Sequence, residues 1–200
     1  GDSGDTGGDD TGGAEPSPGG WAGEYELGDD ATILEPERAG DYLGWSLDVE
    51  GDVDGDGQQD LLVSAVGSDE NGSQTGATYV WTTGVASSGR IKDARLSIYG
   101  DTTGNWSGYQ ALFLPDADGD GSDDIVVSTV TVACTSGTGS PGSVGVFSGA
   151  RTGAVDFSDA DALWAGTDPT TRFACGVASP GDLDGDGVAE LLIGAGGSDD

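Results

Sequence analysis

Acidic residues recur in this chain at a spacing that suits a hard cation. Three nonapeptides, 52–60, 116–124 and 182–190, carry a carboxylate at positions 1, 3, 5 and 9 and glycine at positions 4 and 6. Calcium takes six to eight oxygens at roughly 2.3–2.6 Å, so several carboxylates must converge on one point. Glycine tolerates positive φ and permits the tight winding that this requires. The pattern predicts three calcium loops, with about three Ca²⁺ ions in all.

The predicted side-chain ligands are the carboxylates at these four positions. They are Asp52, Asp54, Asp56 and Asp60, then Asp116, Asp118, Asp120 and Asp124, then Asp182, Asp184, Asp186 and Glu190. In the third loop, Glu190 replaces aspartate at position 9, and its longer side chain shifts the ligating oxygens. Each nonapeptide runs directly into an apolar segment that is typical of a β-strand.

Two other structures share parts of this pattern. Asp-Gly hairpin turns are common between strands, but a two-residue turn does not explain four acidic positions kept in phase three times. An EF-hand loop also begins with alternating aspartates, yet it needs a bidentate glutamate at position 12 and a helix on each side. Position 12 is Val63, Val127 and Ile193 here, which excludes the EF-hand.

The formal net charge of -31, with six basic residues and no histidine, restricts the partners. Nucleic acid is excluded because phosphate binding needs clusters of Lys and Arg, and anionic membrane surfaces are disfavoured for the same reason. No apolar run approaches the roughly 20 residues of a transmembrane helix. The chain has neither an initiator Met nor a signal peptide, so we expect it to be processed or cut from a longer protein.

The composition also predicts that the chain is not an enzyme. Without histidine, neither a Ser-His-Asp nor a Cys-His pair can form, and a histidine zinc site is excluded. A pair of carboxylates could serve a glycosidase, but the conspicuous ones belong to the predicted calcium loops. Lys92 is the single lysine, and its Ile-Lys-Asp-Ala-Arg surroundings are typical of a solvated turn.

The chain divides into a tail and a repeat array. Residues 1–30 are rich in Gly and Asp, which is typical of a flexible stalk or linker. From residue 31 to 200 the landmarks repeat, since Asp116 follows Asp52 by 64 residues and Asp182 follows Asp116 by 66. The units span about 41–104, 105–170 and 171–200, the last one truncated.

Each complete unit reads as four short strands separated by Gly, Asp and Ser turns. In the first unit we expect strands near 45–49, 60–66, 77–82 and 94–99. In the second they lie near 109–114, 124–131, 143–148 and 161–165, and the third unit supplies only 173–179 and 190–195. Residues 31–35 read as the fourth strand of a preceding unit. No segment reads as an amphipathic helix.

Four strands per unit with an acidic loop between the first two resemble the FG-GAP repeat of integrin alpha subunits and many bacterial surface proteins. Its Phe-Gly element corresponds to Leu43-Gly44, Ser107-Gly108 and Phe173-Ala174, and its Gly-Ala-Pro element has drifted further. The resemblance implies an all-β fold of β-propeller-type repeats, with four-stranded antiparallel blades. It also implies calcium ligation by the position 7 carbonyls of Gln58, Ser122 and Val188. This chain supplies about two and a half blades, an incomplete ring.

The two cysteines, Cys134 and Cys175, lie in adjacent repeats. Calcium loops of low affinity suit the outside of a cell, where disulfides also persist, so we expect a Cys134–Cys175 bridge; free buried thiols are the alternative. The resulting hypothesis is a non-enzymatic extracellular or cell-surface protein for adhesion or for binding a protein or glycan partner. The alternative is a structural subunit whose copies assemble head to tail into a calcium-stabilised filament.

Overall fold

The computed structural model describes residues 33–82, 90–131, 134 and 141–197. They belong to a unit that runs from Thr32 to Asp200. The predicted tail of residues 1–30 lies outside the described residues, and its boundary stays a prediction.

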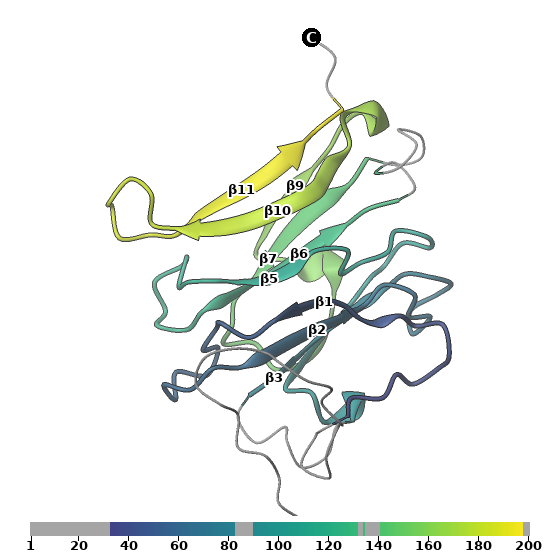
Figure 1. The fold of residues 1–200 in the computed structure, drawn as a ribbon, viewed down its shortest axis with the longest axis horizontal. Coiled ribbons are helices and arrows are strands. Elements are labelled where there is room, and N and C mark those ends of the chain that lie inside the picture. The colour runs from purple at the N-terminus through teal and green to yellow at the C-terminus, as the bar shows by residue number, and fades with distance from the viewer. Residues whose placement is uncertain (1–32, 83–89, 132–133, 135–140, 198–200) are drawn as a thin grey trace, which may run out of the picture. The chain divides into compact units, whose positions relative to one another are not determined.

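The described part of the chain is built mainly from short strands and 3-10 turns and forms three sheets (Figure 1). Blade 1 contains β1 (Leu43–Asp48), β2 (Leu61–Ala65), β3 (Ala77–Trp81) and β4 (Leu96–Tyr99). Blade 2 contains β5 (Ala111–Leu114), β6 (Asp124–Thr129), β7 (Ser143–Phe147) and β9 (Ala162–Ala165). The half-blade contains β10 (Phe173–Gly181) and β11 (Glu190–Ala195). The short turns are η2 (Ile91–Asp93), η3 (Phe157–Asp159) and η4 (Pro169–Thr171).

Neighbouring strands within each blade pair antiparallel. The fold class inferred from the sequence is therefore confirmed: the chain has propeller-type blades of four strands, and the ring is not closed. Every strand that the repeat pattern predicted from residue 45 onward is present, with ends that differ by a few residues.

The central strands of blades 1 and 2 are buried on both faces of their sheets. All six residues of β6 are buried, and so are all five of β3. Such strands lose the alternation of apolar and polar residues that marks a half-exposed strand. Their side chains instead supply two separate clusters, one on each face of the sheet.

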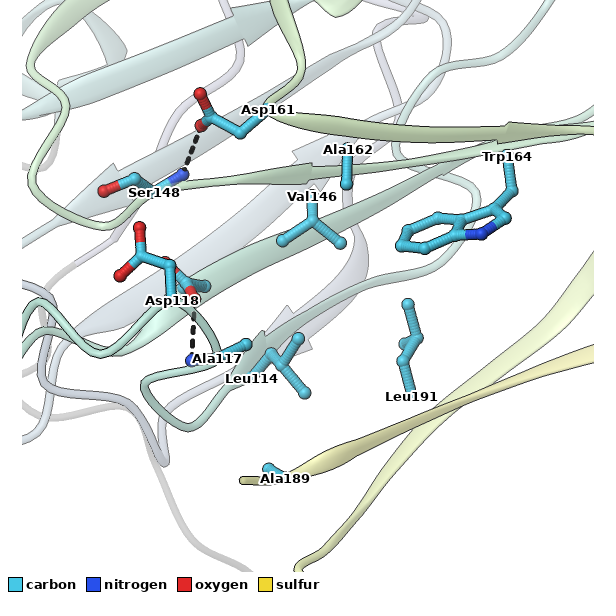
Figure 2. Close-up of a pocket in the computed structure, with 11 residues that line it drawn as sticks. Leu114, Ala117, Asp118, Val146, Ser148, Asp161, Ala162, Trp164, Ala189 and Leu191 are labelled. Carbon is cyan, nitrogen blue, oxygen red and sulfur yellow. Dashed lines mark hydrogen bonds between the residues drawn. The ribbon is translucent and has the colours of Figure 1, made fainter. Parts of the chain in front are cut away.

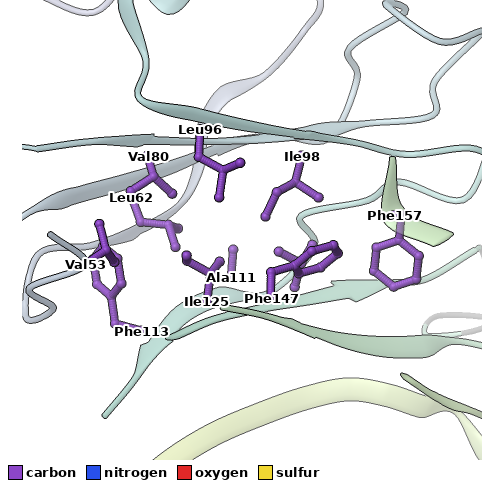
Figure 3. Close-up of a cluster of buried hydrophobic side chains, with 11 residues drawn as sticks. Val53, Leu62, Val80, Leu96, Ile98, Ala111, Phe113, Ile125, Phe147 and Phe157 are labelled. Carbon is purple, nitrogen blue, oxygen red and sulfur yellow. The ribbon is translucent and has the colours of Figure 1, made fainter. Parts of the chain in front are cut away.

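The largest interblade contact is an apolar cluster between blades 1 and 2 (Figure 3). From blade 1 it takes Leu62, Val80, Leu96 and Ile98, together with Val53 of the loop between β1 and β2. From blade 2 and its η3 turn it takes Ala111, Phe113, Ile125, Val127, Phe147 and Phe157. A second cluster, which includes Leu114, Val126 and Val144, joins blade 2 to the half-blade. Burial of these side chains holds consecutive blades together.

One strand was not predicted. β8 (Gly153–Asp156) follows β7 in the chain but pairs parallel with β4, so that it becomes the fifth strand of the blade 1 sheet. Arg95, just before β4, donates from Nη1 to the carbonyl oxygens of Gly149 and Arg151, the latter at 2.9 Å. Blade 2 is thus joined to blade 1 by main-chain pairing as well as by apolar packing.

The strand expected at residues 31–35 is wrong for the described residues. Ile33 and Leu34 have no regular structure, and Glu35 forms only an isolated parallel bridge with Arg90. Residues 33–35 therefore do not form the expected fourth strand of a preceding unit.

The Phe-Gly position of each repeat has a left-handed backbone. Gly44 and Gly108 have φ of +90° and +89°, and Ala174, which replaces glycine in the half-blade, has φ of +66°. The space around the two glycines differs. A Cβ on Gly44 would meet nothing within 4 Å, whereas a Cβ on Gly108 would lie 2.7 Å from Ser64 Cβ and 3.0 Å from the Ala77 carbonyl oxygen.

This pair separates backbone strain from packing. We expect Gly44→Ala to lower the free energy of unfolding by about 1–2 kcal/mol, the cost of a left-handed L-residue. Gly108→Ala should cost roughly 1–3 kcal/mol more, because its methyl group overpacks the junction with blade 1. Chemical denaturation of both variants measures the difference. Equal losses would show that Gly108 does not lie against blade 1.

Candidate metal centre

The three acidic nonapeptides occupy equivalent places in the fold. Loop 1 (52–60) joins β1 to β2, loop 2 (116–124) joins β5 to β6, and loop 3 (182–190) joins β10 to β11. In each loop, the glycines at positions 4 and 6 are left-handed, with φ between +72° and +93°. The glycine requirement inferred from the sequence is therefore met in all three loops.

A common set of hydrogen bonds winds each loop. The N–H of position 5 donates to the carboxylate of position 3 at 3.0–3.2 Å, and the N–H of position 7 donates to the carboxylate of position 5 at 2.8–2.9 Å. The carboxylate of position 9 accepts the N–H of position 2, from Val53, Ala117 and Leu183. Glu190 makes this bond as the two aspartates do. These bonds place one carboxylate beside the next.

The loops bring their carboxylates together. Loop 1 gathers Asp52, Asp54 and Asp60, each with an oxygen within 4.8 Å of the other two. Loop 2 gathers Asp116, Asp118 and Asp120 in the same way. Two oxygens that bind one calcium ion at 2.3–2.6 Å lie at most about 5 Å apart, so both groups fit a single ion.

Loop 3 gathers all four of its predicted acidic residues, namely Asp182, Asp184, Asp186 and Glu190, within the same limit. Asp56 of loop 1 and Asp124 of loop 2 are not in the converging groups. Asp56 accepts the N–H of Gln58, while Asp124 accepts N–H groups from Ala117 and Gly149. The carbonyl ligands at Gln58, Ser122 and Val188 stay predictions.

Two carboxylate oxygens in these loops are buried without a hydrogen-bond partner. They are Asp60 Oδ1 in loop 1 and Asp116 Oδ1 in loop 2. In loops 1 and 3, by contrast, the position 1 carboxylate accepts the N–H of both glycines. A buried carboxylate oxygen with no partner is costly, and a cation would satisfy it. The residues present therefore fit calcium, which would supply positive charge to each loop.

Burial raises the pKa of the loop carboxyl groups that face the core. The pKa of Asp124 is raised to about 6, mainly because its side chain is removed from water, with Asp118 and Asp120 adding repulsion. The pKa of Asp60 is raised by burial and by the charges of Asp54, Asp52 and Asp56. Among the described residues, the ion pairs involve Glu70, Asp93 and Asp161, all outside the loops.

The sequence pattern missed two residues that support loop 2. Ser148, after β7, donates its hydroxyl to Asp120 Oδ2 at 3.1 Å. Asp123, at position 8, accepts the N–H of Asp52 at 2.9 Å and that of Asp116 at 3.3 Å. Position 8 varies among the loops (Gln59, Asp123, Ala189), so the repeat gave no signal there, and Ser148 lies in a different turn.

Outside the loops, Cys134 and Cys175 form a disulfide that links the segment after β6 to β10, with their Cα atoms 5.6 Å apart. The disulfide expected from the sequence is present. No helix among the described residues is both long enough and apolar enough to cross a membrane.

Comparison with known families agrees with the geometry. The FG-GAP repeat family matches residues 43–81, which span β1, loop 1, β2 and β3. This segment is an FG-GAP repeat. The FG-GAP resemblance inferred from the sequence is therefore confirmed for blade 1. No curated protein matches the chain.

The raised pKa of Asp124 predicts how stability depends on pH in the absence of calcium. An acid whose pKa is raised on folding stabilises the fold below its unfolded pKa near 3.9, and this contribution is lost as the pH rises through about 6. One pKa unit corresponds to about 1.4 kcal/mol, so the loss from Asp124 is roughly 3 kcal/mol.

Denaturation of chelator-treated protein at pH 4 and pH 7.5 measures this loss. The matched variant Asp124→Asn carries no charge at either pH, so it should lose less stability over this range than the wild type. If both proteins show the same change, Asp124 does not titrate as its burial requires.

Proposed function

We propose that this chain is a non-enzymatic, extracellular or cell-surface calcium-binding FG-GAP protein that acts in adhesion or in binding a protein or glycan partner. The observation that carries the proposal is the convergence of three or four carboxylates in each loop, with buried partnerless oxygens on Asp60 and Asp116. FG-GAP repeats are typical of extracellular adhesion proteins, and the disulfide fits an oxidising compartment.

Calcium in this proposal has a structural task. Each loop connects the first two strands of a blade, and loop 1 also inserts Val53 into the core between blades 1 and 2. An ion that neutralises the carboxylates would hold the loop in its wound form and fix the position of that side chain. A rigid array of blades then presents a constant surface to a partner.

Calcium titration by calorimetry tests this function. We expect about three ions per chain, with dissociation constants of roughly 10⁻⁴–10⁻³ M, as in extracellular modules. Asp116→Asn should lower the stoichiometry by about one, because it removes a carboxylate from loop 2. Asp101→Asn, an equal loss of charge at an exposed residue outside the loops, should leave it unchanged. Absence of calcium uptake by the wild type would contradict the proposed function.

Thermal unfolding gives a second readout for the same variants. Calcium at a hundred times its dissociation constant stabilises a protein by about 2.7 kcal/mol per site. The wild type and Asp101→Asn should therefore gain more stability from calcium than Asp116→Asn.

A specific observation also favours the alternative function, a structural subunit that assembles from copies of itself. The third sheet has two strands, whereas the other sheets have five and four. Between blades 1 and 2, Leu96 and Ile98 of β4 pack against the aromatic rings of blade 2. The described part of the half-blade has no third or fourth strand that could pack against blade 2 as β4 of blade 1 does.

A cavity lies between blade 2 and the half-blade, where these strands are missing. It has a volume of about 350 Å³ and is lined by Leu114, Val146 and Trp164 of blade 2 and by Leu191 of β11 (Figure 2). The side chain of Trp164, on the wall of this cavity, is 45% exposed. Strands from a second copy would complete the half-blade and cover it. Such a head-to-tail contact closes into a ring or grows into a filament.

Light scattering with and without calcium separates the two functions. A binding module should stay monomeric in calcium, whereas a filament subunit should form very large species that chelation disperses. Trp164→Asp, on the cavity wall of β9, should abolish assembly, while Leu163→Asp, at the similarly exposed neighbouring residue that does not line the cavity, should not. Persistence of the large species in Trp164→Asp would exclude completion of the half-blade as the contact.

A further inference from the structure

Asp123, at position 8 of loop 2, is hydrogen-bonded both to its own loop and to loop 1. Its Oδ2 accepts the N–H of Asp52, the first residue of loop 1, at 2.9 Å. Its Oδ1 accepts the N–H of Asp116, the first residue of loop 2, at 3.3 Å. Its own N–H donates to the Asp52 carbonyl oxygen at 3.0 Å. One side chain therefore sets the position of the first acidic residue of each loop.

The surroundings hold Asp123 in this place. A Cβ on Gly149 would overlap the Asp123 carbonyl oxygen, so the turn after β7 packs directly on its main chain. A Cβ on Gly55 of loop 1 would lie 4.0 Å from the Gly121 carbonyl oxygen of loop 2, so the two loops lie close together. A shift of Asp52 would thus be transmitted to Asp116 through a short and well-packed connection.

We propose that Asp123 couples loops 1 and 2, so that calcium in one loop raises the affinity of the other. This inference rests on the proposed calcium function. The first ion orders the carboxylates of its own loop and, through Asp123, holds the first residue of the neighbouring loop. The second ion then meets a loop that is already partly ordered, and this gives positive cooperativity.

The repeat provides an internal comparison. Position 8 is Ala189 in loop 3, which has no side-chain acceptor for the main chain of loop 2. Loop 3 should therefore bind calcium independently of loops 1 and 2. Three ions per chain would consist of one coupled pair and one independent ion.

The coupling can be measured loop by loop with amide NMR signals of the position 6 glycines, Gly57, Gly121 and Gly187, during calcium titration. Asp54→Asn weakens loop 1 and leaves Asp52 and Asp123 in place. It should lower the calcium affinity at Gly121 by at least about fivefold, the lower end of typical coupling. Asp184→Asn, the equivalent change in loop 3, should leave the affinity at Gly121 unchanged.

Asp123→Asn tests the residue itself, since its amide nitrogen cannot accept one of the two main-chain N–H groups. In that background, Asp54→Asn should no longer alter the affinity at Gly121, which completes a double-mutant cycle. If all three glycines respond to calcium but Asp54→Asn and Asp184→Asn affect Gly121 equally or not at all, the coupling is refuted and calcium binding stands. If no glycine responds in the wild type, the proposed function fails as well.

Discussion

The packing of blade 1 against blade 2 depends on a loop that faces two ways. The carboxylates of loop 1 gather on one side, and Val53, between two of them, is fully buried in the interblade core. Asp60 ties the two sides together because its carboxylate accepts the Val53 N–H at 2.7 Å. Repulsion among the carboxylates therefore acts directly on an apolar contact. The alignment of the two blades therefore depends on how the charge of loop 1 is balanced.

Loop 3 shows the same loop in a different setting. Its winding hydrogen bonds match those of loop 1, yet Leu183, the equivalent of Val53, is 64% exposed. The wound loop thus forms without a neighbouring blade to receive its apolar side chain. Local glycine and aspartate chemistry specifies the loop, and the blade contact is added to it.

The sequence predicted most of the blade architecture because local signals carry it. The glycines at 55 and 57, with their equivalents, mark the loops, and β-branched runs such as 124–129 mark the strands that follow. The prediction failed at β8, since Gly153–Asp156 is short and pairs in parallel with a strand more than fifty residues earlier. It also failed at residues 33–35, because the local sequence does not show whether a strand-like segment has a neighbouring strand to pair with. Asp123 was missed because its role depends on the contact between two loops, which spacing within one loop does not encode.

The parallel pairing of β8 with β4 has a consequence for how the array forms and bears load. The sheet of blade 1 is incomplete until residues 153–156 have left the ribosome. Blade 1 therefore cannot complete its folding until most of blade 2 has been synthesised. Once formed, the two blades share main-chain hydrogen bonds, and a pulling force cannot peel one away without shearing this strand out of the other. Under tension, blades 1 and 2 would therefore unfold together and not one after the other.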